Sequence, residues 1–188
     1  MISSLACARR EVSSKVGSLG RAIMSDFVDH YRSKTVAITG ASGYLASALI
    51  DPLEETGAHI MRISRRDLDA ISGTEALKAD ISTRACWEEI VRKADIIFHL
   101  AGNTSAYDAG KAPSDSLNST VLPVTHLVAA AQAARRNVRV VFASTVTVYG
   151  LTPNLPVAED VQPKPITIYD LHKLFAETQL ELASKQGI

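Results

Sequence analysis

A tyrosine and a lysine lie four residues apart near the end of the sequence, at Tyr169 and Lys173. If this segment is helical, their side chains share one face of the helix. A free phenol, with a pKa near ~10, is a poor base at neutral pH, but a nearby ammonium group would stabilise the phenolate and lower that pKa. Such a pair can take a proton from a substrate hydroxyl while hydride leaves for an acceptor. A surface helix with a lysine and a half-buried tyrosine is the competing interpretation.

A glycine-rich turn, Thr39–Ala46 (TGASGYLA), follows an apolar run and precedes a helical pattern. Gly40 permits a tight turn, Gly43 lets the backbone approach a pyrophosphate, and Ala46 keeps the helix close to the sheet. The free N–H groups and the dipole at a helix start favour phosphates. The context predicts dinucleotide binding, against the alternative of a plain strand–helix turn.

The end of the second apolar run bears on which nicotinamide cofactor would bind. An acid there binds the ribose hydroxyls and repels a 2′-phosphate. Here the chain reads Ser64-Arg65-Arg66, with no acid until Asp67. Because guanidinium groups pair well with phosphate, the sequence favours NADP(H), with NAD(H) as the alternative. The competing interpretation is that both arginines are solvated surface residues.

The elements that must position these residues follow from the hydrophobic pattern. Strands are expected at 34–39, 58–64, 75–79, 95–100 and 138–144, and helices at 43–55, 83–92, 114–135 and 168–185. Apolar strands that alternate with helices indicate a parallel sheet buried on both faces. We therefore expect a Rossmann-like, doubly wound α/β fold with helices on both faces. The fifth run ends in Ser144 and Thr145, at the carboxyl edge where such sheets bind ligands.

Composition excludes several classes of function. Lys plus Arg and Asp plus Glu both total 20, so net charge points to neither nucleic acid nor a membrane surface as partner. No apolar run is long enough to span a bilayer. The five histidines lack ligand spacing, so no metal site is expected. Cys7 and Cys86 are interpreted as free thiols in a reducing compartment, and a cytoplasmic location is expected.

Residues 1–33 differ in character from the rest and are treated as an N-terminal extension or leader. They are rich in Ser, Ala and scattered basic residues, with Glu11 as the only acid before Asp26. An organelle-targeting segment and an over-extended start before Met24 both fit this composition. The folded domain is expected to cover 34–188.

Several motifs in order resemble the extended short-chain dehydrogenase/reductases, the NAD(P)-dependent epimerase/dehydratase family that modifies nucleotide sugars. They are TGxxGxxA at Thr39–Ala46, Asp80–Ile81, HLAG at His99–Gly102, Asn118 in the long helix, ASTVTVYG at Ala143–Gly150, and YxxxK at Tyr169–Lys173. The resemblance covers Lys34 to the C-terminus.

The resemblance implies roles for particular residues. Tyr169 would be the acid/base, Thr145 (more weakly Ser144) would hydrogen-bond the reacting oxygen, and Lys173 would tune Tyr169 and hold the nicotinamide ribose. The implied cofactor-binding residues are Gly40, Ser42, Gly43, Tyr44, Leu45, Arg65, Arg66, Asp80, Ile81, Leu100, Ala101, Gly102, Asn118, Tyr169 and Lys173.

The implied function is an epimerase or reductase that acts on a nucleotide-linked sugar by hydride transfer. The family's dehydratases have Thr-Asp-Glu where this chain has Thr145-Val146-Thr147, which disfavours dehydration. Pro123 lies inside the long helix and puts the alignment around Asn118 in doubt. The resemblance also implies a homodimer through the helices that carry Asn118 and Tyr169.

Family members continue with a further strand and a substrate-binding lobe, which we expect this chain to lack. The fifth strand would then keep an unpaired edge. The alternative function is therefore a dinucleotide-binding fragment, or a regulatory or interaction subunit, without turnover of its own.

Overall fold

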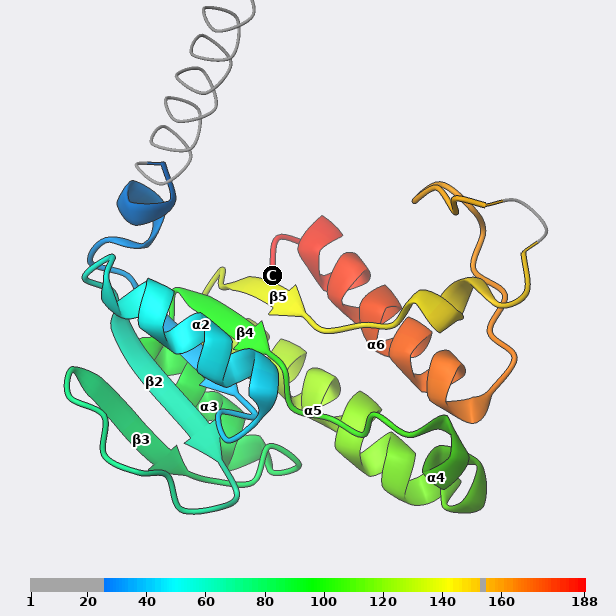
Figure 1. Ribbon diagram of the computed structural model, residues 1–188, viewed down its shortest axis with the longest axis horizontal. Coiled ribbons are helices and arrows are strands. Elements are labelled where there is room, and N and C mark those ends of the chain that lie inside the picture. Colours follow the sequence, from blue (N-terminus) through cyan, green and yellow to red (C-terminus); the bar gives the residue numbers. More distant parts are fainter. Residues whose placement is uncertain (1–25, 153–154) are drawn as a thin grey trace, which may run out of the picture.

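The computed structural model describes residues 26–152 and 155–188. Its centre is a sheet of five parallel strands in the order β3-β2-β1-β4-β5, which is the expected Rossmann-like arrangement (Figure 1). The strands are β1 (Thr35–Thr39), β2 (His59–Ser64), β3 (Thr74–Lys78), β4 (Ile96–His99) and β5 (Arg139–Phe142). The chain reverses direction across the sheet between β1 and β4, so the carboxyl ends of these two strands flank a topological switch point.

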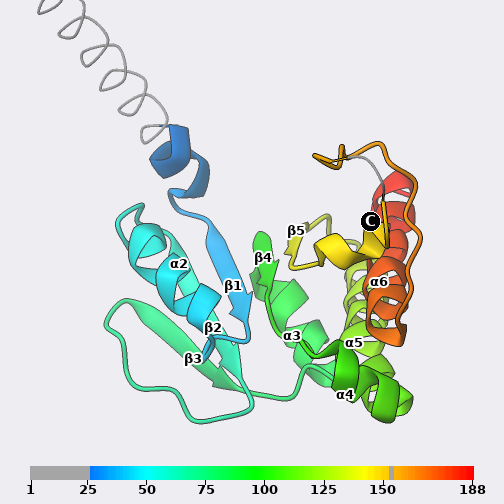
Figure 2. The same cartoon turned by 45° about the vertical axis from the view of Figure 1, so that its right-hand side comes forward.

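Helices cover both faces of the sheet, as predicted. Helix α2 lies on one face, α3 and α5 lie on the other, and α6 packs alongside α5 (Figures 1 and 2). Their bounds are α2 (Tyr44–Glu54), α3 (Arg84–Lys93), α5 (Pro113–Ala134) and α6 (Ile168–Lys185). Helix α5 continues through Pro123, so this proline does not interrupt the helix that carries Asn118.

The core has two parts because successive strand residues point to opposite faces. In β1, Val36 and Ile38 pack toward the α2 side with Leu53. Ala37, between them, packs with Trp87 of α3 on the other side. All five side chains are fully buried. The continuous apolar strand that the sequence predicted is therefore sandwiched between two helical layers.

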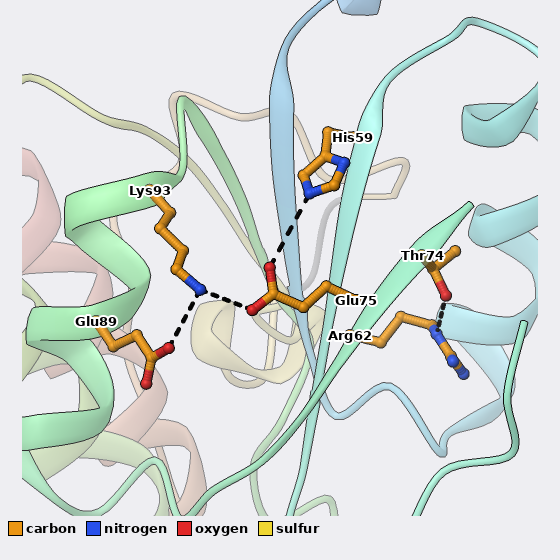
Figure 3. A network of polar contacts seen from close by, with 6 residues as sticks. All are labelled: His59, Arg62, Thr74, Glu75, Glu89 and Lys93. Atoms are coloured by element: carbon orange, nitrogen blue, oxygen red, sulfur yellow. Dashed lines mark hydrogen bonds and ion pairs between the residues drawn. The ribbon is translucent and has the colours of Figure 1, made fainter. Parts of the chain in front are cut away.

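Polar contacts hold the outer strand β3 in place (Figure 3). Lys93 of α3 bonds Glu75 of β3 at 2.6 Å and Glu89 at 3.2 Å. On the neighbouring strand, the buried Arg62 donates through Nε to Thr74 Oγ1 at 2.8 Å. Partly exposed ion pairs contribute little to stability, so these contacts chiefly fix the position of β3.

Residues 26–31 are helical and pack against the domain, although the sequence assigned them to an N-terminal extension. Phe27 and Tyr31 contact the α2-side core, and the Tyr31 ring lies 6.3 Å from that of Phe98. Residues 1–25 of the expected extension lie outside the described residues. So do residues 153–154.

Two short elements were not predicted: α4 (Ala106–Lys111) and the 3₁₀ helix η1 (Val146–Tyr149). Ser105 caps α4 by accepting a hydrogen bond from the Asp108 N–H at 3.1 Å. In the part of the chain that the structure describes, no helix has the length and apolar character needed to cross a membrane.

Candidate functional site

A cleft of about 960 Å³ opens at the carboxyl edge of the sheet, where β1, β2 and β4 end. Thirteen of the fifteen predicted cofactor-binding residues line it: Gly40, Ser42, Gly43, Tyr44, Leu45, Arg65, Arg66, Asp80, Ile81, Leu100, Ala101, Gly102 and Asn118. Sequence reasoning missed others, including Ser64, Asn103, Thr104 and Ser119. Ser64, Asn103 and Thr104 lie at or just after the ends of β2 and β4, so the strand ends were the signal that could have found them. Ser119 follows the predicted Asn118 on α5.

The glycine turn brings the backbones of β1 and β4 into close contact. Gly40 has φ +71°, and a Cβ added there would lie 2.9 Å from the Ala101 backbone nitrogen. Gly43 then starts α2 without a side-chain cap, and the first turn of the helix carries no acid. The first N–H groups of α2 are therefore left for a ligand at the cleft, as a diphosphate requires. This local geometry fits a dinucleotide.

A buried Thr39–His99 pair holds the two strand ends together. Thr39 Oγ1 lies 2.7 Å from His99 Nδ1 and accepts a hydrogen bond from the Ala101 N–H at 3.2 Å. Burial lowers the pKa of His99 to about 3, and the charge of Lys173 acts in the same direction. His99 is therefore a neutral, buried residue that packs between the two strand ends. Among the described residues, no group of three or more His, Cys, Asp or Glu side chains could hold a metal ion.

Another part of the cleft lining is the Asp80–Ile81 segment, which Trp87 of α3 holds in place. This fully buried indole donates to the Ile81 carbonyl at 2.7 Å. The Asp80 carboxylate accepts from the Ser82 N–H at 2.9 Å, which is the main cause of its lowered pKa, and the nearby charge of Arg65 adds to the effect. Asp80 is therefore an ionised hydrogen-bond acceptor at the cleft.

Thr145, Tyr169 and Lys173 come together beyond the Gly102 end of the cleft. The buried Lys173 Nζ donates to the Ala143 carbonyl at 2.8 Å and lies 5.9 Å from the centre of the Tyr169 ring. Thr145 is close enough to Tyr169 to act on the pKa of its phenol, which it lowers. A Cβ added at Gly102 would lie 3.5 Å from Lys173 Nζ, so the lysine connects this group to the cleft.

The comparisons with known proteins agree with this geometry. A model of the NAD dependent epimerase/dehydratase family matches residues 36–188. The chain belongs to this family. It is 31% identical over 158 residues to the UDP-glucose 4-epimerase of Azospirillum brasilense, a match that covers 79% of this chain and 44% of that enzyme. The resemblance to the extended short-chain dehydrogenase/reductases is thus confirmed.

Solved structures of family members share the fold. MoeE5 in complex with UDP-glucose and NAD matches with a TM-score of 0.70 and 28% identity, over 79% of this chain and 48% of that one. A UDP-glucose 4-epimerase from Stenotrophomonas maltophila, with bound NAD and formylated UDP-arabinopyranose, matches with a TM-score of 0.72 and 25% identity, over 82% and 50%. The chain spans about half the length of the relatives it matches.

The expected effect of Lys173 on Tyr169 is wrong for this structure. The pKa of Tyr169 is raised, mainly because burial disfavours the phenolate, and the charge of Asp170 adds to the rise. Lys173 is itself desolvated, which lowers its pKa, and its amine bonds the Ala143 carbonyl. The phenol is therefore neutral at neutral pH in the ligand-free chain.

His172 joins helices α5 and α6. Its Nδ1 lies 2.9 Å from the hydroxyl of Ser116, a fully buried residue of α5. The contact between Ser116 and His172 joins α5 to α6 and does not include Thr145, Tyr169 or Lys173.

Proposed function

We propose that this chain forms the cofactor-binding part of an enzyme that epimerises a UDP-linked sugar at a hydroxyl-bearing carbon. The observation that supports the proposal is that Lys173 Nζ lies 3.5 Å from where a Cβ on Gly102 would be, and Gly102 lines the dinucleotide-sized cleft. The relatives support the substrate class, because the Azospirillum brasilense enzyme is a UDP-glucose 4-epimerase and MoeE5 binds UDP-glucose and NAD.

The chain's own groups would hold the cofactor and move one proton. The start of α2 would bind the diphosphate, and Asp80 and Ile81 would contact the adenine end of the dinucleotide. A bound nicotinamide would supply the hydride acceptor. Thr145 would hydrogen-bond the reacting oxygen, Tyr169 would exchange a proton with that oxygen, and Lys173 would hold the ribose.

Epimerisation and reduction use the same groups but differ in net chemistry. An epimerase returns the hydride to the sugar, so UDP-glucose should convert to its 4-epimer without net loss of cofactor. A reductase consumes one NAD(P)H per turnover. Incubation of the whole protein with a UDP-sugar, followed by product separation and absorbance at 340 nm, distinguishes the two. If the whole protein binds cofactor but does neither, the non-enzymatic alternative is correct.

We propose that the cofactor is NADP(H), although the solved relatives above hold NAD. Arg65 and Arg66 are exposed and line the cleft next to the end of β2. The first acid after them, Asp67, pairs instead with Lys78 of β3 at 2.8 Å. This leaves two cations next to the end of β2, at the position that would meet a 2′-phosphate.

Replacing both arginines by serine should therefore weaken NADPH binding about ten-fold, because each charge-assisted hydrogen bond contributes about 1.5–3 kcal/mol and solvent screening reduces it. NADH binding should change little. Fluorescence titration with both cofactors measures the two dissociation constants. Arg84→Ser is the matched control, because Arg84 is an exposed arginine on α3 outside the cleft lining. Equal losses for NADPH and NADH would contradict a role in 2′-phosphate recognition.

We also propose that two copies of the chain pair through α5 and α6. Ile168, Leu171, Phe175 and Leu182 of α6 are 37–53% exposed, and their spacing of three, four and seven residues places them on one face of the helix. Leu117 of α5 is also exposed. An apolar stripe of this kind favours burial against a second helix.

Phe175→Glu should then shift the protein from dimer to monomer in light scattering. Leu151→Glu is the control, because Leu151 is 87% exposed outside these helices and should leave the dimer intact. A monomeric parent protein at micromolar concentration would exclude the pairing.

A further inference from the structure

The connection from β2 to β3 contains no helix. Parallel strands are usually joined by a crossover of about a dozen residues or more that includes a helix. Residues 65–73 join these two parallel strands without one, and all of them except the half-buried Leu68 are exposed. This loop begins with Arg65 and Arg66, which line the cleft. The groups that hold the loop therefore influence how the two arginines meet a ligand.

A buried arginine lies on the side of the sheet that the loop crosses. Arg62 of β2 is 3% exposed. Its neighbours Met61 and Ile63 pack in the α3-side core, whereas Ile60 packs in the α2-side core. Because side chains alternate along a strand, Arg62 lies on the α2 side with Ile60. Right-handed crossovers that step in the same direction use the same face of a sheet, so the β2–β3 loop also passes over the α2 side.

Arg62 bonds this part of the chain at two points. Its Nε donates to Thr74 Oγ1 at 2.8 Å (Figure 3), and its Nη2 donates to the Asp69 carbonyl at 2.8 Å. Thr74 Oγ1 in turn donates to the Ile71 carbonyl at 3.0 Å. The middle of the loop and its far end are therefore both tied to one buried guanidinium group.

Other contacts of the loop are more exposed or more local. Asp67 pairs with Lys78 at 2.8 Å, but both side chains are largely exposed, so this ion pair contributes little. The Arg66 N–H donates to Ser64 Oγ at 3.0 Å, which fixes only the start of the loop. The hydrogen bonds of Arg62 come from a buried group, where water competes less for them.

The chemistry of Arg62 suits positioning better than stability. Its two acceptors are a hydroxyl and a carbonyl, so these bonds bring no carboxylate to its buried charge. Burial of a charge costs free energy, and an apolar residue of similar volume in its place is often neutral or stabilising. A guanidinium differs from such a residue in its rigid fork of donors, which can bond two oxygens of the loop at once.

We propose that Arg62 is a positioning residue that holds the β2–β3 loop so that Arg65 and Arg66 face the cleft, and that it thereby sets the selectivity for NADP(H) over NAD(H). This role deepens the proposed choice of cofactor, and its effect on selectivity rests on that choice. Arg62 is not part of the cleft lining, so it acts through the two exposed arginines.

Arg62→Met tests the proposal with two measurements. Methionine keeps an unbranched apolar side chain but removes the donors, and water can replace the lost bond at the exposed Asp69. The fold should therefore persist while the loop loosens. Trypsin should cleave after Arg65 and Arg66 about ten-fold faster, because cleavage follows the population of the open loop. In fluorescence titrations, the variant should lose most of the about ten-fold preference for NADPH.

Two further substitutions separate the hydrogen bonds of Arg62 from its charge. Thr74→Val removes the hydroxyl that accepts from Nε but keeps the shape of the side chain, so both measurements should shift toward those of Arg62→Met. Thr74→Ser keeps the hydroxyl and should behave like the parent chain. Arg62→Lys keeps the charge without the fork and should also lose selectivity. Full selectivity in Arg62→Lys would overturn the proposal, because charge alone would then explain the preference.

Arg139→Met is the matched control, because Arg139 is an exposed strand residue of β5 outside the cleft lining. It should change neither measurement. Unchanged cleavage or unchanged selectivity in Arg62→Met would overturn the proposal. A parent chain that binds NADPH and NADH equally would instead contradict the proposed cofactor. Trypsin cleavage needs no cofactor, so faster cleavage in Arg62→Met would still support the positioning of the loop, and an unchanged rate would still overturn it.

Discussion

Tyr169→Phe is expected to reduce kcat of the whole protein by about 10²–10⁴-fold while leaving the affinity for the cofactor nearly unchanged. The phenol is the proton donor and acceptor in the proposed reaction, and general acid–base catalysis contributes about this factor. The ring packs on α6 beside Lys173, and phenylalanine preserves that packing. Cofactor titration and steady-state kinetics on a UDP-sugar measure the two quantities.

Tyr107→Phe is the matched control. Tyr107 is 69% exposed on α4, where its ring contacts Lys111, so loss of its hydroxyl should leave kcat within about two-fold of the parent value. Turnover that survives in Tyr169→Phe would remove Tyr169 from the mechanism, whatever the cofactor does.

Gly40→Ala is expected to weaken cofactor binding at least about ten-fold and to lower the free energy of unfolding by about 3 kcal/mol. The left-handed backbone conformation at φ +71° accounts for about 1–2 kcal/mol of that loss. The rest comes from the new methyl group, which would lie 2.9 Å from the Ala101 nitrogen and push the ends of β1 and β4 apart. Denaturant unfolding and NADH titration report the two effects separately.

Gly57→Ala isolates the backbone part of this cost. Gly57 has φ +75°, but a Cβ there meets nothing within 4 Å. It should therefore show the backbone cost alone, about 1–2 kcal/mol, and normal cofactor binding. If the two variants behave alike, the close approach at Gly40 does not shape the cleft.

The fold could be predicted because the apolar and glycine residues that specify each element lie within a short stretch of sequence. The apolar residues of β1 and the glycines that follow them specify a buried strand and a tight turn without any tertiary information. Helix α4 was missed because Gly110 and the polar residues around it give no apolar periodicity, although Ser105 and Asp108 form a readable capping pair. The boundary at residue 33 rested on composition, which does not reveal that Phe27 and Tyr31 contact the core.

Residue type and spacing were enough to find the site residues, but they did not predict the direction of the pKa shift of Tyr169. The spacing of Tyr169 and Lys173 places both on one side of α6, yet it does not show that the lysine amine turns to the Ala143 carbonyl or that the phenol is partly buried. Burial, together with the charge of Asp170, raises the pKa of the phenol where the sequence alone predicted a fall.

The central claim is that the cleft binds a nicotinamide dinucleotide with its reactive end beside Tyr169. Titration of the folded chain with NADPH and NADH, followed by nicotinamide fluorescence, tests this most directly. The account predicts saturable binding of a reduced cofactor to the parent chain and to Tyr169→Phe, and weaker binding to Gly40→Ala. A folded chain that binds neither cofactor would contradict it.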